Sequence, residues 1–257
     1  MNRFSAIQNI RQRLSEGGIT VGSWIQIPHA SVAEIMGRAG YDWVAVDMEH
    51  GTISPHQLPD LFRALELGGT LPLVRLAQGY PKDCKQALDA GAGGVIVPMV
   101  KSAEQLRAVC EACCWPPTGN RGVGFSRANL FGKNFDAYKS EARSPLLVAM
   151  IEHVQAVEQL DAILDVEGLD AILVGPYDLS ASMGLSGMFD HNDFKAIMQR
   201  IGDLAKDAGI PSGVHVVQPS DSELSDRISE GYRFLAYSID AVMLRIAAEC
   251  PNVGKIK

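Results

Sequence analysis

The chain has 257 residues, of which 47% are hydrophobic and 21% are charged, and its formal net charge is −7. This length suits one large domain or two small ones, and we expect a single domain over residues 1–257, because an α/β barrel of about 250 residues would use all of it. The composition is that of a soluble globular protein, and the acidic balance argues against a broad nucleic-acid-binding face.

The first predicted element is an amphipathic helix at the N-terminus. Four apolar residues share one of its faces: Phe4, Ile7, Ile10 and Leu14. The charged residues between them argue against a signal peptide or a membrane span. No later stretch approaches ~18 uninterrupted apolar residues, so we expect no membrane association.

Eight short apolar runs follow, separated by segments with helical spacing. The runs are VGSWIQI (21–27), WVAVDM (43–48), LPLVRL (71–76), GVIVPM (94–99), LLVAMIE (146–152), AILVGP (171–176), SGVHVV (212–217) and RFLAYSI (233–239). Several helical segments end in a glycine, as expected where a helix closes in the left-handed conformation. Strands alternating with helices predict a (β/α)8 TIM barrel, with an open doubly wound sheet as the alternative.

Ionisable side chains gather where the predicted strands end. The stretch VAVDMEHG (44–51) has three of them within four positions, and other strands end in an arginine or a carboxylate. These residues are Asp47, Glu49, His50, Arg75, Glu152 and Asp178. In a barrel the C-terminal ends of the strands carry the active site, so we expect these groups around one mouth.

Glu152 and Asp178 follow neighbouring strands. A structural salt bridge for Glu152 and a helix N-cap role for Asp178 are the simpler interpretations. Their joint placement favours a divalent cation held by two carboxylates, and such a ligand set fits Mg²⁺ or Mn²⁺. We expect one of these cations as cofactor, with Co²⁺ as a further candidate.

Arg75 and His50 are the candidates for charge stabilisation and proton transfer. Arg75 ends an apolar strand, where a guanidinium needs an anion, and pairing with Asp47 or Glu49 is the structural alternative to a substrate. His50 has Asp47 three residues earlier, and this carboxylate could orient its ring and raise its basicity. The histidines without such a neighbour are interpreted as structural: His56, His153, His191 and His215.

The lysines argue against a Schiff-base enzyme. Such an enzyme needs a lysine that projects into the barrel from a strand, and no predicted strand contains one. A metal ion is then expected to act as the electrophile.

Two further features of the sequence are its longest connection between predicted strands and its cysteines. Residues 116–132, PPTGNRGVGFSRANLFG, form a Gly- and Arg-rich segment that we expect to lie over the mouth. The five cysteines are odd in number and irregularly spaced, which indicates a reducing cytoplasm. They are Cys84, Cys110, Cys113, Cys114 and Cys250, and the three central ones fall in the helical pattern AEQLRAVCEACCW, so we expect helix thiols.

With these residues in place, the chain resembles the HpcH/HpaI aldolase family of metal-dependent, pyruvate-specific class II aldolases. The likeness runs from GSWIQIPHASVAEIMGRAGYDWVAVDMEH through PLVRL, IVPMV, PPTGNRGVG and IEHVQAVEQLDAIL to VEGLDAILVGPYDLSASMG. Five motifs recur in the same order, which makes the resemblance specific.

The resemblance implies a carbon–carbon lyase. The expected reaction is reversible retro-aldol cleavage of a 4-hydroxy-2-oxo acid, either a 2-keto-3-deoxy sugar acid or a dicarboxylate, to pyruvate and an aldehyde through a metal-bound enolate. Glu152 and Asp178 match the metal ligands, Arg75 the arginine beside the keto oxygen, and His50 with Asp47 the acid/base pair. The predicted substrate-binding residues are Trp24, Glu49, Arg75, Gly175, Pro176, Tyr177 and Asp178.

The resemblance further implies a homohexamer, a trimer of dimers in which the C-terminal helix AVMLRIAAEC is exchanged between subunits. One position departs from the family pattern, because Met150 stands where a glutamine is frequent, so the preferred aldehyde cannot be carried over. Two alternatives stay open. One is a citryl- or malyl-CoA-type lyase, although no basic cluster for its phosphates is evident, and the other is a non-catalytic barrel that binds an oxo acid.

Overall fold

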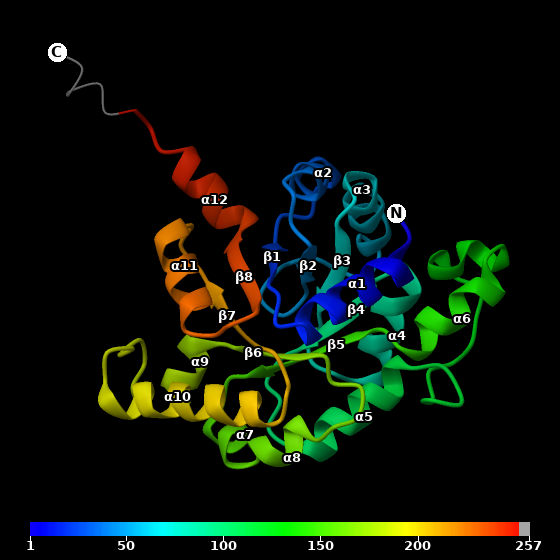
Figure 1. Cartoon of the computed structure of the whole chain (residues 1–257). Coiled ribbons are helices and arrows are strands. Elements are labelled where there is room, and N and C mark those ends of the chain that lie inside the picture. The colour runs from blue at the N-terminus through cyan, green and yellow to red at the C-terminus, as the bar shows by residue number, and fades with distance from the viewer. Residues whose placement is uncertain (252–257) are drawn as a thin grey trace.

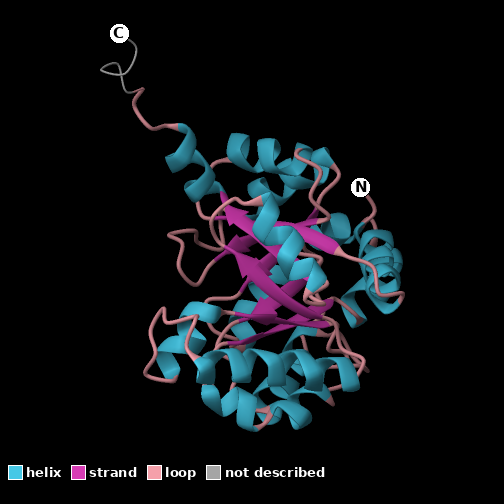
Figure 2. Ribbon diagram, turned by 60° about the vertical axis from the view of Figure 1, so that its left-hand side comes forward, coloured by secondary structure: helices cyan, strands magenta, loops and turns pink. Residues whose placement is uncertain are grey.

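The computed structural model describes residues 1–251; Lys255, Lys257 and the rest of 252–257 lie outside the described part. Eight parallel strands form one closed barrel in the order of the sequence, surrounded by helices (Figures 1 and 2). The last strand pairs with the first, with Val21 opposite Leu235. This closure confirms the TIM barrel and excludes the open sheet.

Each predicted strand is present, with ends that differ by one or two residues. The strands are β1 Thr20–Ile25, β2 Trp43–Asp47, β3 Leu71–Arg75, β4 Gly94–Val97, β5 Leu146–Ile151, β6 Ala171–Val174, β7 Ser212–Val216 and β8 Phe234–Ile239. The helices are α1 Arg3–Ser15, α2 Ala30–Arg38, α3 Leu58–Gly68, α4 Pro81–Ala90, α5 Ala103–Cys113, α6 Phe135–Arg143, α7 Val154–Glu158, α8 Leu160–Leu164, α9 Pro176–Ser182, α10 Asn192–Asp207, α11 Asp221–Ser229 and α12 Asp240–Ala247, and η1 Arg127–Gly132 is a 3₁₀ helix. Gly69 and Gly91 end α3 and α4 in the left-handed conformation, as predicted.

The strands are apolar on both faces because each face is covered. One set of side chains fills the barrel interior, and the alternate set packs under the surrounding helices. Inside the barrel, Trp43 stacks on Phe234 with ring centroids 4.5 Å apart. Gly22 makes this possible, since a Cβ there would lie 2.0 Å from the Trp43 ring.

Helix α1 closes the N-terminal end of the barrel. Its buried residues are Ile7, Ile10 and Leu14, and they belong to the same apolar cluster as the barrel interior. The predicted amphipathic face is therefore a plug, and the opposite end of the barrel is left for the site.

The segment at 116–132 does not lie over the mouth of its own barrel. Helix α5 runs back from the C-terminal end of β4, so the connection that follows it lies at the N-terminal end. There Arg3 of α1 donates a hydrogen bond to the Ala128 carbonyl at 2.5 Å, and Arg127 donates one to the Ala90 carbonyl at the end of α4. The expectation of a mouth loop was wrong, because mouth loops follow strands and this segment follows a helix.

The C-terminal helix α12 projects away from the barrel (Figure 1). Its first residue, Asp240, is buried and accepts hydrogen bonds from the backbone N–H groups of Gln26 and Ile27. Further along, Leu244 is 56% exposed and Ile246 is 40% exposed. The helix is thus anchored at its start and presents an apolar surface beyond it.

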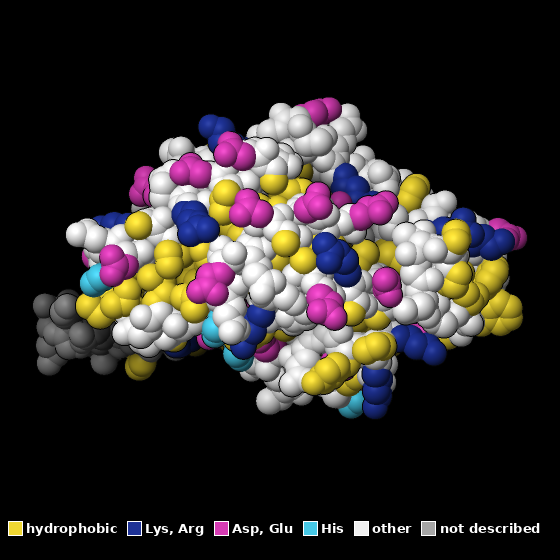
Figure 3. Space-filling view, turned by 90° about the horizontal axis from the view of Figure 1, so that it is seen from below, with side chains coloured by type: hydrophobic (Ala, Val, Ile, Leu, Met, Phe, Trp, Pro, Cys, Tyr) yellow, Lys and Arg dark blue, Asp and Glu magenta, His cyan; other side chains and the backbone are white. Residues whose placement is uncertain are grey.

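No helix within residues 1–251 combines the length and the apolar character needed to cross a bilayer. On the face of the molecule seen in Figure 3, acidic and basic side chains are interspersed and form no continuous basic field.

Candidate active site

The centre of the site is an ion pair between the ends of two adjacent strands. Asp47 ends β2 and Arg75 ends β3, and the strand register places them opposite each other. Arg75 donates two hydrogen bonds to the Asp47 carboxylate, from Nε at 2.9 Å and from Nη2 at 2.6 Å. Burial raises the pKa of Asp47, but the hydrogen bonds and charge of Arg75 outweigh it and hold this pKa below its usual value. Asp47 is therefore an anion that fixes the guanidinium.

Asp47 also shapes the turn that follows β2. Its Oδ1 accepts hydrogen bonds from the backbone N–H groups of Glu49 at 3.0 Å and His50 at 3.2 Å. The turn is tight, since a Cβ on Gly51 would lie 2.5 Å from the Asp47 carbonyl oxygen. Gln26 donates to the other oxygen, Oδ2, at 2.8 Å, and this oxygen also accepts from Nη2 of Arg75. The carboxylate thus holds the backbone of His50 and not its ring, which differs from the predicted pairing, because Arg75 and the turn occupy its oxygens.

The ring of His50 lies at the rim, where its side chain is 58% exposed. Its Nε2 is 3.8 Å from Oε2 of Glu49. The same Glu49 oxygen lies 3.2 Å from Nη1 of Arg75, yet it is buried and accepts no well-aligned hydrogen bond. Glu49 therefore connects the guanidinium to the imidazole and retains an unsatisfied oxygen.

Glu152 follows β5 and is only 2% exposed. Its Oε2 accepts a hydrogen bond from the backbone N–H of Met99 at 3.0 Å. Met99 has a positive φ of 49°, which is unusual for a residue with a side chain. Gly175 lies against the other side of the carboxylate, since a Cβ there would be 2.5 Å from Oε1. The glycine leaves room for the carboxylate at the mouth.

The two buried glutamates of the site, Glu49 and Glu152, have raised pKa values. Burial raises the pKa of Glu152 to about 7, and the charges of Glu49 and Asp178 add to this effect. Burial likewise raises the pKa of Glu49 to about 7, assisted by the charges of Asp47 and Asp178. Asp178 lies in the first turn of α9, close enough to act on both glutamates. Three carboxyl groups, those of Asp47, Glu49 and Glu152, thus act on the single guanidinium, and Asp178 acts on the two glutamates, so acidic groups outnumber the basic one.

Two residues form the floor of the site. Trp24, which is 1% exposed, places its ring 4.7 Å from Cζ of Arg75. Its ring also lies 5.7 Å from the imidazole of His215, between ring centroids. Sequence reasoning interpreted His215 as structural, although a polar residue at an inward position of an apolar strand was a usable signal.

Three other lone histidines do have structural roles. His153 and His191 precede α7 and α10, and each accepts a backbone hydrogen bond through Nδ1. His56 pairs with the Ser54 hydroxyl at 2.7 Å. The cysteines are also as predicted: all five are free thiols, and the three in AEQLRAVCEACCW lie in or beside α5.

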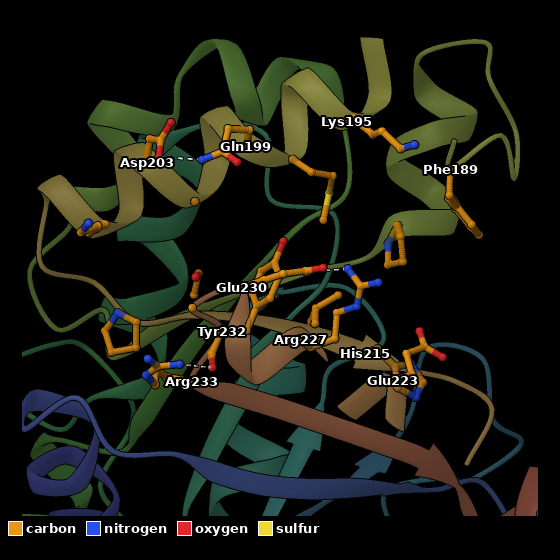
Figure 4. A pocket seen from close by; sticks show the side chains of 18 of the residues that line it. Phe189, Lys195, Gln199, Asp203, His215, Glu223, Arg227, Glu230, Tyr232 and Arg233 are labelled. Atoms are coloured by element: carbon orange, nitrogen blue, oxygen red, sulfur yellow. Dashed lines mark hydrogen bonds and ion pairs between the residues drawn. The ribbon is translucent and has the colours of Figure 1, made fainter. Parts of the chain in front are cut away.

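The predicted residue Tyr177 lies at the rim. It is 57% exposed and packs edge-on against Phe189 with ring centroids 5.0 Å apart. Together with Pro176 it borders a cavity of about 1020 Å³ that lies beside the mouth, between α10, α11 and β7. Figure 4 shows this groove with His215 and Glu223 at one end. The structure therefore brings Trp24 together with the charged residues and leaves Tyr177 outside them.

The donor set can be compared with the needs of a metal ion. Among residues 1–251, no cluster of three or more His, Cys, Asp or Glu side chains is arranged around one metal position. Glu152 and Asp178 would supply two oxygens, and a hard cation accepts water and substrate oxygens for the rest. The raised pKa values of Glu49 and Glu152, and the unsatisfied oxygen of Glu49, mark a position where a positive charge would be stabilised. The residues present therefore fit a divalent cation.

A parallel barrel with carboxylates and an arginine at its C-terminal mouth is the architecture of an enzyme that acts on small anionic substrates. Comparison with known proteins supports an enzyme of this class. The profile of the family HpcH/HpaI aldolase/citrate lyase matches residues 20–247. The chain belongs to this family.

Two relatives and one solved structure illustrate the similarity. The chain is 37% identical over 246 residues to a hydroxypyruvate/pyruvate aldolase of Roseobacter denitrificans, covering 93% of each chain. It is 36% identical over 239 residues to a 2-keto-3-deoxy-L-rhamnonate aldolase of Salmonella gallinarum, covering 91% of this chain and 87% of the relative. A crystal structure of a family member from Burkholderia cenocepacia superposes with a TM-score of 0.87 at 30% identity, covering 93% and 95% of the two chains.

These findings confirm the resemblance, the barrel and the prediction of an aldolase, a carbon–carbon lyase.

Proposed function

We propose that the chain, as one domain over residues 1–257, cleaves a 4-hydroxy-2-oxo acid reversibly to pyruvate and an aldehyde with the help of a divalent cation. The observation that carries this proposal is the group of Asp47, Glu49, Glu152 and Asp178 around Arg75. Two of these carboxylates have a pKa raised to about 7 by burial and by one another. Such a site gains most from a cation that also binds the oxo acid.

Glu152 and Asp178 are the proposed ligands of Mg²⁺ or Mn²⁺, with Co²⁺ as a further candidate. When bound, this ion would supply a Lewis acid that stabilises the negative charge developing on the 2-oxo group. The strands of the barrel contain no lysine, so no residue is placed to form a Schiff base from a strand.

Arg75 is the proposed electrostatic partner of the same developing charge. Its bonds to Asp47 and its position on the Trp24 ring fix the guanidinium before the substrate arrives, so little reorganisation is needed. Gly175, Pro176 and Tyr177, together with Asp178, are proposed to border the carboxylate of the oxo acid.

His50 is the proposed base for the proton of the 4-hydroxyl. Its exposed ring at the rim suits the outer, aldehyde half of the substrate. In cleavage the C3–C4 bond breaks, the hydroxyl proton passes to His50, and the electron pair remains on the pyruvate half. Glu49, between Arg75 and His50, is proposed to hold the imidazole near this position.

The test is a panel of aldehydes offered with pyruvate and Mg²⁺, Mn²⁺ or Co²⁺, with product formation as the readout. We expect an aldol product that depends on the added ion and disappears with chelator. A lysine adduct trapped by borohydride in the presence of pyruvate would overturn the metal-dependent mechanism.

A CoA-thioester lyase is the second candidate, and one observation favours it. The sequence showed no basic cluster, but the fold gathers one in a groove of about 690 Å³ between α3 and α4. Its cationic lining residues are Arg63, Lys82, Lys85 and Arg127. Arg63 and Arg127 pair with Asp60 and Glu66, which reduces the free positive charge. Binding of coenzyme A that is lost in Lys82→Glu/Lys85→Glu would support this candidate, and absence of binding would dismiss it.

We also propose that the chain forms homohexamers in the cytoplasm. The exposed apolar residues Leu244 and Ile246 on α12 support exchange of this helix between subunits. The five free thiols agree with a reducing compartment. Light scattering of the chain and of Leu244→Ser/Ile246→Ser tests the assembly, since the variant should form smaller species.

A further inference from the structure

The turn after β4 contains a residue in an unfavourable backbone conformation. Met99 follows Pro98 in this turn, and its φ is 49°. A positive φ brings the Cβ of any residue other than glycine close to a carbonyl oxygen, so it persists only where other contacts hold it. The Met99 N–H donates the one hydrogen bond that the Glu152 carboxylate accepts among residues 1–251, to Oε2 at 3.0 Å. The unfavourable turn thus lies next to the proposed metal ligand.

One side chain binds the backbone of residues 99–101 at two points. Oε1 of Gln105 accepts a hydrogen bond from the Lys101 N–H at 2.8 Å, and Nε2 of Gln105 donates one to the Met99 carbonyl at 3.3 Å. A single amide group supplies both the acceptor and the donor, whereas a carboxylate can only accept and an ammonium group can only donate. The glutamine is therefore matched to the backbone conformation that it contacts.

Helix α5 gives this side chain a fixed base. Gln105 lies in the first turn of α5, and its own N–H donates to the hydroxyl of the N-cap residue Ser102 at 3.2 Å. The helix is held against the barrel by its buried residues, which include Leu106 and Val109. Gln105 itself is exposed, so its side chain is not part of the apolar core.

We infer that Gln105 is a positioning residue for the cation site, although its side chain bonds to the turn and not to a carboxylate. Its amide holds Met99 at a positive φ, and in this conformation the Met99 N–H fixes Oε2 of Glu152. Oε1, on the side of Gly175, is then left for the cation. This inference rests on the proposed function, in which Glu152 is a metal ligand. Groups that orient a ligand change metal affinity by roughly 10- to 100-fold when they are removed.

The first test compares Gln105→Ala with a matched control, Gln199→Ala. Gln199 is an exposed glutamine in α10 whose side chain bonds to Asp203 at 2.9 Å. Mn²⁺ affinity of the full-length protein is measured by electron paramagnetic resonance without substrate. We expect Gln105→Ala to bind Mn²⁺ roughly 10-fold more weakly at a nearly unchanged melting temperature, while the control keeps wild-type affinity. A lower melting temperature with unchanged affinity would show a purely structural glutamine and would overturn the inference.

Two more variants test whether the effect passes through Met99. Gln105→Glu can still accept from the Lys101 N–H, but it places a carboxylate against the Met99 carbonyl, so we expect a loss of affinity at least as large as in Gln105→Ala. Met99→Gly has no Cβ and adopts a positive φ readily, so the bonds from Gln105 matter less. The loss caused by Gln105→Ala should therefore be smaller in Met99→Gly than in the wild type. Wild-type affinity in Gln105→Glu, or an equal loss in both backgrounds, would contradict the inference.

Hydrogen exchange of the metal-free protein separates this result from the proposed function. Mass spectrometry of the peptide that contains Met99 should show faster exchange in Gln105→Ala, and unchanged exchange would refute the positioning role whatever reaction is catalysed. If exchange and affinity change as expected but no aldehyde yields an aldol product, the positioning role stands and the aldolase proposal fails. If aldol products form and Gln105→Ala binds Mn²⁺ like the wild type, the aldolase proposal stands and Gln105 has no positioning role.

Discussion

The glycine that borders Glu152 offers the sharpest test of the site. In Gly175→Ala the added Cβ would lie 2.5 Å from Oε1, 2.8 Å from Cγ and 3.0 Å from Cδ of Glu152. Atoms cannot approach this closely, so the glutamate must shift. It is 2% exposed and bonded to the Met99 N–H, and a shift therefore disturbs both its packing and this bond.

The expected magnitudes follow from this collision. Overpacking a buried position costs about 1–3 kcal/mol in the free energy of unfolding. A displacement of the carboxylate by about 1 Å is expected to lower kcat/KM roughly 10²-fold, because the productive geometry is lost. Mn²⁺ affinity, measured by electron paramagnetic resonance without substrate, should fall as well.

Gly202→Ala is the matched control. Gly202 lies in α10, and a Cβ there meets nothing within 4 Å. Since alanine favours the helix, this variant should be more stable by about 0.5–1 kcal/mol and fully active. If Gly175→Ala kept wild-type turnover and Mn²⁺ affinity, Glu152 would not be held in place by Gly175, or would not be a ligand.

Three further predictions concern the charged residues. His50→Ala should lower turnover by roughly 10²- to 10⁴-fold while the melting temperature stays unchanged, because the ring is mostly exposed; wild-type turnover would return His50 to a structural role. Arg75→Lys should slow cleavage by ~10²-fold, as for loss of one oxyanion donor, and should slow deuterium exchange into the methyl group of pyruvate. This substitution should also lower the free energy of unfolding, unlike a substitution at the surface, because lysine cannot reproduce the two hydrogen bonds to buried Asp47. If deuterium exchange were normal while cleavage was slow, Arg75 would act on the aldehyde half of the substrate instead. Finally, the pKa of Glu152 rises from 4.5 to about 7 on folding, so the folded state binds the proton more tightly and the metal-free protein should lose stability as the pH rises through this window. Thermal unfolding with chelator between pH 4.5 and 8 measures this, and a slope that is unchanged in Glu152→Gln would assign it to other groups.

The sequence by itself determined the barrel and most of the site. Eight apolar runs alternating with helical segments leave few other ways to bury both faces of each strand, and parallel strands necessarily bring their ends to one mouth. For this reason Asp47, Glu49, Arg75, Glu152 and Asp178 could be assigned to one place from local pattern alone.

Only the tertiary structure decided which partners these groups have. The Asp47 carboxylate can accept only a few hydrogen bonds. Arg75, on the adjacent strand, meets it with better geometry than the imidazole of His50 does. Such competition depends on distances between strands, which the order of residues does not contain. The segment 116–132 was misplaced for a related reason, because its composition suggests a functional loop while its position is set by the direction of α5.

His215 shows the same limit at a single residue. Its sequence neighbours are ordinary for a strand, and its only signal in the chain is that of a polar residue at an inward position of an apolar strand. Its hydrogen bond exists because the irregular pairing of β1 with β8 brings the Ser238 carbonyl to one ring nitrogen. Residue types are fixed by the chain, but the partners of this ring are set by strands that meet in the closed barrel.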